Sequence, residues 1–303
     1  MKDALFAGVN AAVLTPMRDD LSVDLDRMAG HCHWLLANGC TGLAVLGTTG
    51  EANSIGINER LALLDGLAER GVPTDRLMPG TGVPALTDTV RLTRQAASLG
   101  CRGALLLPPF YYKNPSDDGL FAFFSEVIQR VGGGIRFYLY NFPQQSAVPL
   151  SVALIGRLLH AYPDAVKGVK DSSGSYESGR AYIEAFAKHG FEVYAGDDTL
   201  LQPLLRLGAA GCITAAANVN AAVAHQVYAG FDSPAVEAAN TALCASRAAV
   251  AGPLLIPSLK ALMARHTGYA GWHTIRPPHL RLSDEQAATV YAAFDACGVT
   301  IPA

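Results

Sequence analysis

The amino-acid sequence predicts an α/β fold, a (β/α)8 (TIM) barrel with a C-terminal helical appendage. Short β-rich apolar runs alternate with longer segments of helical period, which is typical of repeated βα units around a parallel sheet. There are eight such runs, and closing eight strands into a barrel removes the exposed edges of the sheet. The first run ends at LTPM (14–17) without a glycine-rich phosphate loop, which disfavours the alternative, an open doubly wound sheet.

The predicted strands are short apolar segments, each bounded by glycine, proline or polar residues. In chain order they are GVNAAVLTP from residue 8, GLAVLG from 42, LMPGTG from 77, GALLLPP from 103, IRFYLYN from 135, VKGVKDSS from 166, FEVYAGD from 191 and GCITAAA from 211.

The segments between these runs predict amphipathic helices, because their apolar residues recur three and four positions apart. Examples are residues 58–70, 87–99, 116–131 and 176–189. Several follow a serine, threonine, asparagine or aspartate and end before a glycine, as capped helices do.

About 80 residues remain after the eighth run, and they are helical in pattern at 235–251, 256–266 and 284–296. No linker sequence separates them from the rest of the chain. We therefore predict a barrel over residues 1–225 and a C-terminal helical extension over 226–303, packed on the barrel as a single structural unit.

Composition narrows the classes of function. The chain has 303 residues, of which 50% are hydrophobic and 16% charged, with a formal net charge of −3, as expected for a soluble globular protein. Without a basic stripe or a long apolar segment, we expect no nucleic-acid partner, no membrane partner and no signal peptide. The six cysteines are widely spaced, which favours reduced thiols in a cytoplasmic protein.

Polar residues at the C-terminal ends of the predicted strands are the candidates for chemistry, because the working site of such a barrel lies there. A strand's period of two places Lys170 on the same face as Gly168 and Ser172, and Tyr140 on the same face as Tyr138. If these faces point inward, a lysine stands beside a tyrosine in the mouth of the barrel. The strand-end polar residues are Thr15, Thr48, Thr49, Thr81, Tyr111, Tyr112, Tyr140, Asn141, Lys170, Ser172, Asp197, Asp198 and Thr214.

Burial of such a lysine favours its neutral, nucleophilic form. The sequence has no evident metal-ligand cluster, cofactor loop or Ser-His-Asp arrangement, so Schiff-base chemistry on a carbonyl substrate without a cofactor is the reaction that Lys170 suggests. The alternative is a structural lysine, paired with Asp171 or with Asp197 and Asp198.

Other conspicuous residues have structural interpretations. We interpret His31 and His33 as surface histidines around the core cysteine Cys32, because adjacent helical positions point in different directions. One of Asp197 and Asp198 is expected to cap a helix, and Glu51 to stand at a helix start.

Five motifs together resemble the pyruvate-dependent class I aldolases and synthases, the family of dihydrodipicolinate synthase and N-acetylneuraminate lyase. The resemblance covers nearly the whole chain. In order, the motifs are GTTGE at 47–51, GTG at 80–82, PFYY at 109–112, YNFP at 140–143 and GVKDSSG at 168–174.

The resemblance implies that Lys170 forms an imine with pyruvate or a 2-oxo acid, while Tyr140 transfers protons. It also implies a relay from Tyr140 through Thr48 to a tyrosine of a neighbouring subunit. That tyrosine is Tyr111, or alternatively Tyr112. The implied assembly is a homo-oligomer, a dimer of dimers.

The resemblance further implies which residues bind substrate. Thr48 and Thr49 would hold the pyruvate carboxylate, and the carbonyl of Ile213 would face the imine. Gln145 stands where dihydrodipicolinate synthases have an arginine for the second carboxylate, and a neutral amide lacks that charge. The remaining predicted substrate-binding residues are Ser172, Asp198 and Gly196.

We therefore expect a lyase for a 2-keto-3-deoxy sugar acid or a related hydroxy-oxo acid, by aldol cleavage, condensation or dehydration. Substitution of the family's lysine-feedback histidines by Ile57 and Arg60 also disfavours the alternative, dihydrodipicolinate synthase. A second alternative, from another class, is a binding or regulatory relative that has lost turnover.

Overall fold

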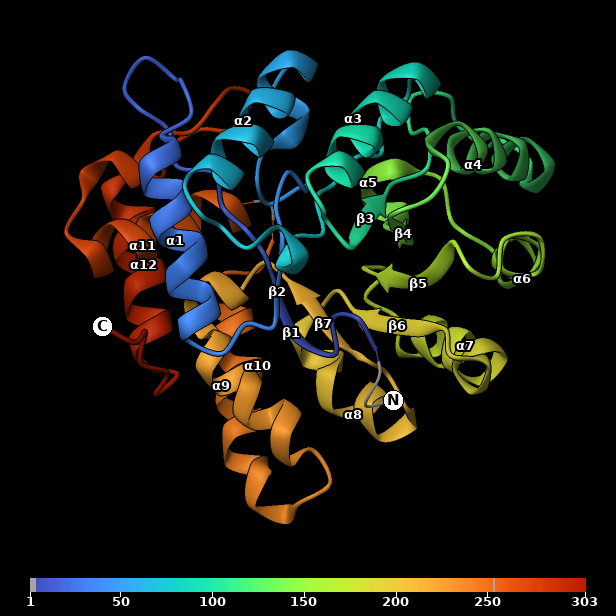
Figure 1. Cartoon of the computed structure of the whole chain (residues 1–303). Helices are drawn as coiled ribbons and strands as arrows, with labels where there is room; N and C mark the ends of the chain where they lie inside the picture. Colours follow the sequence, from blue (N-terminus) through green and yellow to red (C-terminus); the bar gives the residue numbers. More distant parts are fainter. Residues whose placement is uncertain (1–3, 253) are drawn as a thin grey trace.

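A parallel sheet rolled almost into a closed barrel forms the centre of the molecule in a computed structural model that describes residues 4–252 and 254–303 (Figure 1). Within these residues the hydrogen-bonded strand order is β2-β1-β7-β6-β5-β4-β3. The strands are β1 (Gly8–Ala12), β2 (Gly42–Ala44), β3 (Gly103–Leu106), β4 (Arg136–Asn141), β5 (Val166–Asp171), β6 (Glu192–Ala195) and β7 (Gly211–Thr214).

The prediction of a third strand from residue 77 is wrong, but this segment lies between β2 and β3, in the position of the missing strand. Leu77 bridges to Leu43 on β2, and Gly80 bridges to Leu105 on β3, both in the parallel sense. Pro79, between them, has no N–H to continue a ladder. The barrel prediction is therefore confirmed, with seven strands and one bridging segment in the part of the chain that the structure describes.

Helices surround the strands (Figure 1), and the predicted ones are found within a few residues of their expected ends. The predicted helix at 176–189 ends its α-helical part at Phe186 and continues as one 3-10 turn. The helices are α1 (Leu25–Ala37), α2 (Ile57–Glu69), α3 (Leu86–Ser98), α4 (Asp117–Val131), α5 (Pro143–Ser146), α6 (Val152–Ala161), α7 (Tyr176–Phe186), α8 (Leu201–Leu207), α9 (Ala217–Gly230), α10 (Glu237–Ala249), α11 (Leu255–Thr267) and α12 (Asp284–Asp295).

Serine side chains begin several of these helices. Ser116, Ser151 and Ser175 each accept a hydrogen bond from a backbone N–H of the first turn of α4, α6 and α7. These bonds satisfy N–H groups that have no partner within the helix. The helix starts on the outer face of the barrel are therefore defined locally, as the sequence predicts.

A buried carboxylate lies inside the barrel, and sequence reasoning missed it. Tyr138 and Tyr194 donate hydrogen bonds to Oε2 of Glu192 at 2.9 and 2.6 Å. Burial and this carboxylate raise the pKa of both phenols well above the ordinary value. Glu192 stands within an apolar run, so an isolated acid in a strand was the available signal.

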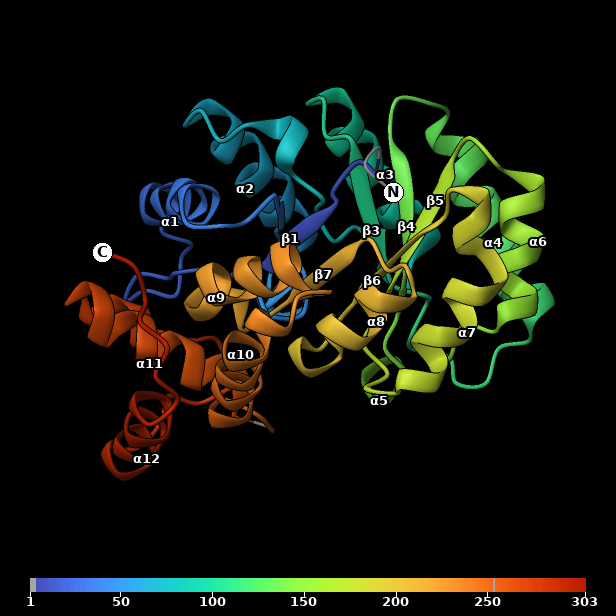
Figure 2. The same ribbon diagram turned by 90° about the horizontal axis from the view of Figure 1, so that it is seen from below.

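The C-terminal helices α10, α11 and α12 pack against one side of the barrel, next to α9 and α1 (Figure 1). Figure 2 shows α10 and α12 at the same end of the molecule as α5, which follows β4. Helix α9 runs across residue 225, where the sequence places the division of the chain, and that division stays a prediction. None of the helices described is both long and apolar enough to span a bilayer.

Candidate active site

Lys170 and Tyr140 lie side by side in the interior of the barrel. The register of β4 and β5 pairs these two residues, and Nζ of Lys170 is 4.3 Å from the centroid of the Tyr140 ring. Their side chains are 5% and 4% exposed. Tyr140 also stacks on Phe142, with ring centroids 5.7 Å apart. The structure thus shows that the faces carrying Lys170 and Tyr140 point inward, and it brings the amine and the phenol together.

The amine of Lys170 has no carboxylate within 4.0 Å among the residues described, so the buried ion pair considered from the sequence is not formed there. Asp171 points to the opposite face of β5, where Asn141 Nδ2 and the Ser173 N–H donate to its Oδ1 at 2.9 and 3.0 Å. The Lys170 amine and the Asp171 carboxylate therefore lie on opposite faces of the strand.

Thr48 and Thr49 lie in the turn after β2. Thr48 is half-buried and lines, together with Tyr140, a small cavity of about 20 Å³. The carbonyl of Thr48 accepts from the N–H of Glu51 at 3.0 Å, which closes the turn before a short 3-10 helix. Thr48 and Tyr140 therefore share one space at the carboxyl ends of the strands.

An ion pair between two buried side chains, Glu51 and Lys260, supports this turn, and sequence reasoning missed this pairing. Glu51 is buried, forms an ion pair with Nζ of Lys260 on α11, and accepts from the N–H of Arg276 at 3.0 Å. Burial lowers the pKa of Lys260, while Glu51 opposes that shift. Glu51 stands at the start of the short 3-10 helix, as predicted, but its side chain makes no capping bond there and instead links the turn to the C-terminal helices.

Arg60 braces the same turn from α2. Its Nε donates to the carbonyl of Ile55 at 3.0 Å, and its terminal nitrogen donates to the carbonyl of Ala52. Burial lowers the pKa of Arg60 to about 10. Arg60 also lines the small cavity beside Thr48 and Tyr140, so a guanidinium stands at the edge of the candidate site.

Ser172 and Gly196 lie against each other at the ends of β5 and β6. The Ser172 N–H donates to the carbonyl of Asn141, and the Gly196 N–H to the carbonyl of Asp171, both at 2.8 Å. A Cβ atom on Gly196 would lie 2.1 Å from Oγ of Ser172. Glycine at this position therefore leaves the room that the Ser172 hydroxyl needs. Ile213 is fully buried in the same apolar cluster of the barrel interior as Tyr140.

Asp198 is enclosed by protein groups. Thr214 Oγ1 donates to its Oδ1 at 2.9 Å, and Arg247 on α10 lies 3.7 Å from Oδ2. Burial, and then the charge of Asp197, raise the pKa of Asp198 to about 6 against the opposing effect of Arg247. The expected cap is confirmed at Asp197, which accepts from the N–H of Thr199 at 3.0 Å. With 0% of Asp198 exposed, its predicted substrate contact requires the surrounding groups to move.

Gln145, Tyr111 and Tyr112 are exposed. Gln145 lies on α5, and the two tyrosines, 72% and 77% exposed, stand edge to face in the loop before α4. The relay between subunits stays a prediction. By contrast, the interpretation of His31 as a surface residue is wrong, because it is buried and its Nε2 lies 2.8 Å from Oδ1 of Asn218.

Comparison with known proteins decides the family. The family model described as the dihydrodipicolinate synthetase family matches residues 5–297. The chain belongs to this family. An uncharacterised DapA-like lyase of Chloroflexus aurantiacus is 35% identical over 291 residues, which is 95% of this chain and 96% of that protein.

Solved structures of family members have the same fold. Dihydrodipicolinate synthase from Agrobacterium tumefaciens is 34% identical, with a TM-score of 0.89 over 96% of this chain and 99% of that one. A prophage protein of the family from E. coli K12, in complex with pyruvate, is 25% identical, with a TM-score of 0.88 over 98% and 100% of the two chains. Family membership makes the protein an enzyme, a class I lyase, as the sequence predicts.

Proposed function

We propose that the protein is a Schiff-base lyase or aldolase in which Lys170 forms an imine with pyruvate or another 2-oxo acid. The observation that carries this proposal is the amine of Lys170, buried in the barrel 4.3 Å from the centre of the Tyr140 ring. The pyruvate complex of the E. coli K12 family member supports the choice of substrate class. A buried amine beside a phenol has a nucleophile and a proton donor in one place.

Imine formation uses both side chains. The neutral Nζ of Lys170 adds to C2 of the ketone, and Tyr140 donates a proton to the developing hydroxyl. Loss of water from the resulting carbinolamine leaves the protonated imine. Thr48 and Thr49, in the turn after β2, hold the substrate carboxylate with backbone and hydroxyl donors, and the carbonyl of Ile213 faces the imine carbon.

The imine then acts as the electron acceptor for bond cleavage. Tyr140, as the phenolate, removes the proton of the C4 hydroxyl, the C3–C4 bond breaks, and an aldehyde leaves. The electron pair remains as an enamine, which is protonated at C3 before water releases pyruvate from Lys170. Loss of a C3 proton followed by expulsion of the C4 hydroxyl as water would give dehydration from the same imine.

The substrate is a 2-keto-3-deoxy sugar acid or a related hydroxy-oxo acid. The hydroxyl of Ser172, beside Gly196, and the amide of Gln145 suit the recognition of hydroxyl groups. Asp198 joins them if the Thr214 and Arg247 contacts open. The active form is a homo-oligomer, a dimer of dimers, in which Tyr111 of a neighbouring subunit completes the relay, with Tyr112 as the alternative.

The second candidate is dihydrodipicolinate synthase, also called 4-hydroxy-tetrahydrodipicolinate synthase, the activity for which the Agrobacterium tumefaciens protein is named. Gln145 speaks against it, because an amide cannot replace the bidentate charge of arginine on a second carboxylate. Consumption of aspartate semialdehyde with pyruvate, at a rate above that of sugar-acid cleavage, would establish this candidate instead.

Borohydride trapping with pyruvate tests the imine. We expect a covalent adduct that peptide mapping assigns to Lys170 and that is absent in Lys170→Ala. Lys167→Ala is the matched control, because Lys167 stands on the same strand but donates outside the barrel to the carbonyl of Gly190. If the native chain forms no adduct with any 2-oxo acid tried, the interpretation as a non-catalytic binding relative is favoured.

Tyr140→Phe separates binding from turnover. We expect turnover of 2-keto-3-deoxygluconate to fall by about 10²–10⁴-fold, because the proton donor is lost, while borohydride still traps an adduct on Lys170. Steady-state kinetics and intact mass measure the two effects. Unchanged turnover would remove Tyr140 from the mechanism.

A further inference from the structure

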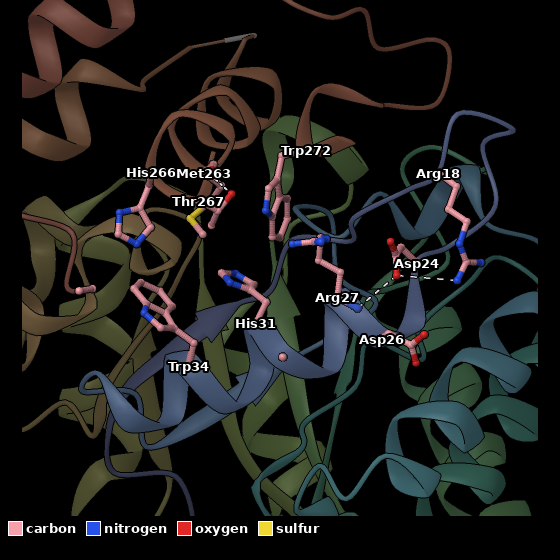
Figure 3. Close-up of a pocket in the computed structure, with 12 residues that line it drawn as sticks. Arg18, Asp24, Asp26, Arg27, His31, Trp34, Met263, His266, Thr267 and Trp272 are labelled. Atoms are coloured by element: carbon pink, nitrogen blue, oxygen red, sulfur yellow. Dashed lines mark hydrogen bonds and ion pairs between the residues drawn. The ribbon is translucent and has the colours of Figure 1, made fainter. Parts of the chain in front are cut away.

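A second cavity, of about 860 Å³, lies outside the barrel between α1 and the C-terminal helices. Figure 3 shows aromatic side chains at one end of it and charged side chains at the other. The cavity shares no lining residue with the small space beside Thr48 and Tyr140. It is therefore separate from the candidate active site, and its volume lies in the range of small-molecule sites.

The aromatic end is built around the buried His31. Its ring stacks on Trp34 at a centroid distance of 5.7 Å and an interplanar angle of 12°, and meets Trp272 edge-on at 5.0 Å. The hydrogen bond to Asn218 holds the imidazole in place, and burial lowers the pKa of His31 to about 4, so the ring is neutral at pH 7. Three π systems thus form a fixed, uncharged wall.

Two donors in this cavity lack partners. The indole Nε1 of Trp272 and the Nε of Arg27 are buried and have no hydrogen-bond partner within residues 4–252 and 254–303. Trp272 is 1% exposed, and the Arg27 guanidinium lies 3.5 Å from the centre of the Tyr269 ring. Both atoms are closed off from solvent, whereas Arg27 as a whole is only half-buried, so the terminal nitrogens of its guanidinium are the donors that a ligand in the cavity can reach.

The two side-chain carboxylates that line the cavity are already engaged. Asp24 caps α1 by accepting from the N–H of Arg27 at 3.1 Å, and Asp26 pairs with Arg70 at 2.6 Å. The cavity therefore offers a half-buried cation, Arg27, next to an aromatic wall. A matching ligand must supply a flat π surface, hydrogen-bond acceptors and negative charge.

We propose that this cavity binds a planar aromatic carboxylate. The ligand ring packs against Trp34 and Trp272, and its carboxylate accepts from Arg27. This site is independent of the imine chemistry at Lys170.

The chain has two tryptophans, Trp34 and Trp272, and both line this cavity, so quenching of tryptophan emission reports on it directly. The probe is 4-nitrobenzoate, compared with uncharged 4-nitrobenzamide, with affinities measured by isothermal titration calorimetry on the full chain. We expect the carboxylate to bind at least about 10-fold more tightly than the amide, since only the carboxylate forms a charge-assisted hydrogen bond with Arg27. No quenching and no heat at millimolar 4-nitrobenzoate would overturn the proposal.

Variants place the probe. Arg27→Gln should weaken 4-nitrobenzoate about 10-fold and leave 4-nitrobenzamide unchanged, whereas the exposed Arg91→Gln on α3 is the matched control with no effect. Trp34→Leu should weaken both compounds, and Lys170→Ala neither. Circular dichroism checks that each variant is folded. Binding that survives Arg27→Gln unchanged, or that is lost in Lys170→Ala, would assign the probe to another site.

Discussion

His31 and Asp198 are both fully buried, yet burial shifts their pKa values in opposite directions. A buried imidazole resists protonation, so the pKa of His31 falls to about 4. A buried carboxyl resists ionisation, so the pKa of Asp198 rises to about 6. In both cases burial favours the neutral form of the side chain. Each group therefore makes the free energy of unfolding depend on pH between about 4 and 6.5.

The two residues predict opposing pH effects on stability. The unfolded chain protonates His31 below 6.5, so the stability it contributes is present above that pH and is lost as pH falls to about 4, by about 3 kcal/mol. For Asp198 the folded pKa exceeds the unfolded one, so its contribution is present below 3.8 and is lost as pH rises to about 6, again by about 3 kcal/mol.

Urea denaturation of His31→Gln and Asp198→Asn at pH 4.5 and pH 7 separates these contributions. We expect the first variant to lose less unfolding free energy than wild type on acidification, and the second to lose more. A pH dependence identical to wild type in both variants would show that neither group controls it.

At the scale of secondary-structure elements, α11 supports the turn after β2. Lys260 and Glu51 form a buried ion pair across these elements, and Arg276 adds a backbone bond to the same carboxylate. Such a pair is costly to break from one side, because the remaining charge stays buried without its partner. The position of Thr48 therefore depends on a helix far along the chain.

Lys260→Met tests this support. We expect a loss of about 3–5 kcal/mol of unfolding free energy, measured with urea, because Glu51 is left uncompensated. The double variant Glu51→Gln with Lys260→Met should lose less than the sum of the single variants. The exposed Lys188→Met is the matched control. A loss below about 1 kcal/mol for Lys260→Met would mean that water enters and solvates the carboxylate.

At the scale of the whole molecule, two neighbouring aromatic side chains project from the loop before α4. Tyr111 and Tyr112 are 72% and 77% exposed, and tyrosine is enriched at protein interfaces. This exposure supports the proposed assembly of subunits, in which one of these phenols enters the site of a neighbour.

Conservative variants distinguish the relay from the interface. Tyr111→Phe should lower turnover about 10-fold or more without changing the mass in light scattering, since only the hydroxyl is lost. Tyr112→Phe should leave both unchanged if Tyr111 is the relay residue. The double change of both tyrosines to alanine should reduce the mass. A wild-type monomer with full turnover would contradict the proposed arrangement.

Much of the fold and part of the candidate site could be predicted from the sequence. The alternation of apolar runs and helical segments predicted the barrel, and the strand period of two predicted which residues share a face with Lys170 and with Tyr140, while the direction of those faces was left open. Pro79 explains the one strand that fails, because a residue without N–H interrupts a ladder. The periodicity of apolar residues indicates which residues share a face of an element, and for neighbouring strands this places residues of the same face near one another.

The barrel, its helices and the sharing of strand faces by Lys170 and Tyr140 with their neighbours followed from the sequence, because these features depend on local patterns. Which distant polar groups meet depends on the assembled fold. Glu51 pairs with Lys260 on α11, and His31 on α1 is hydrogen-bonded to Asn218 on α9. The hydrophobic period of a helix or strand does not predict such partners, because the burial of each side chain depends on how the elements are assembled. For that reason the support of the Thr48 turn and the aromatic cavity were visible only in the folded chain.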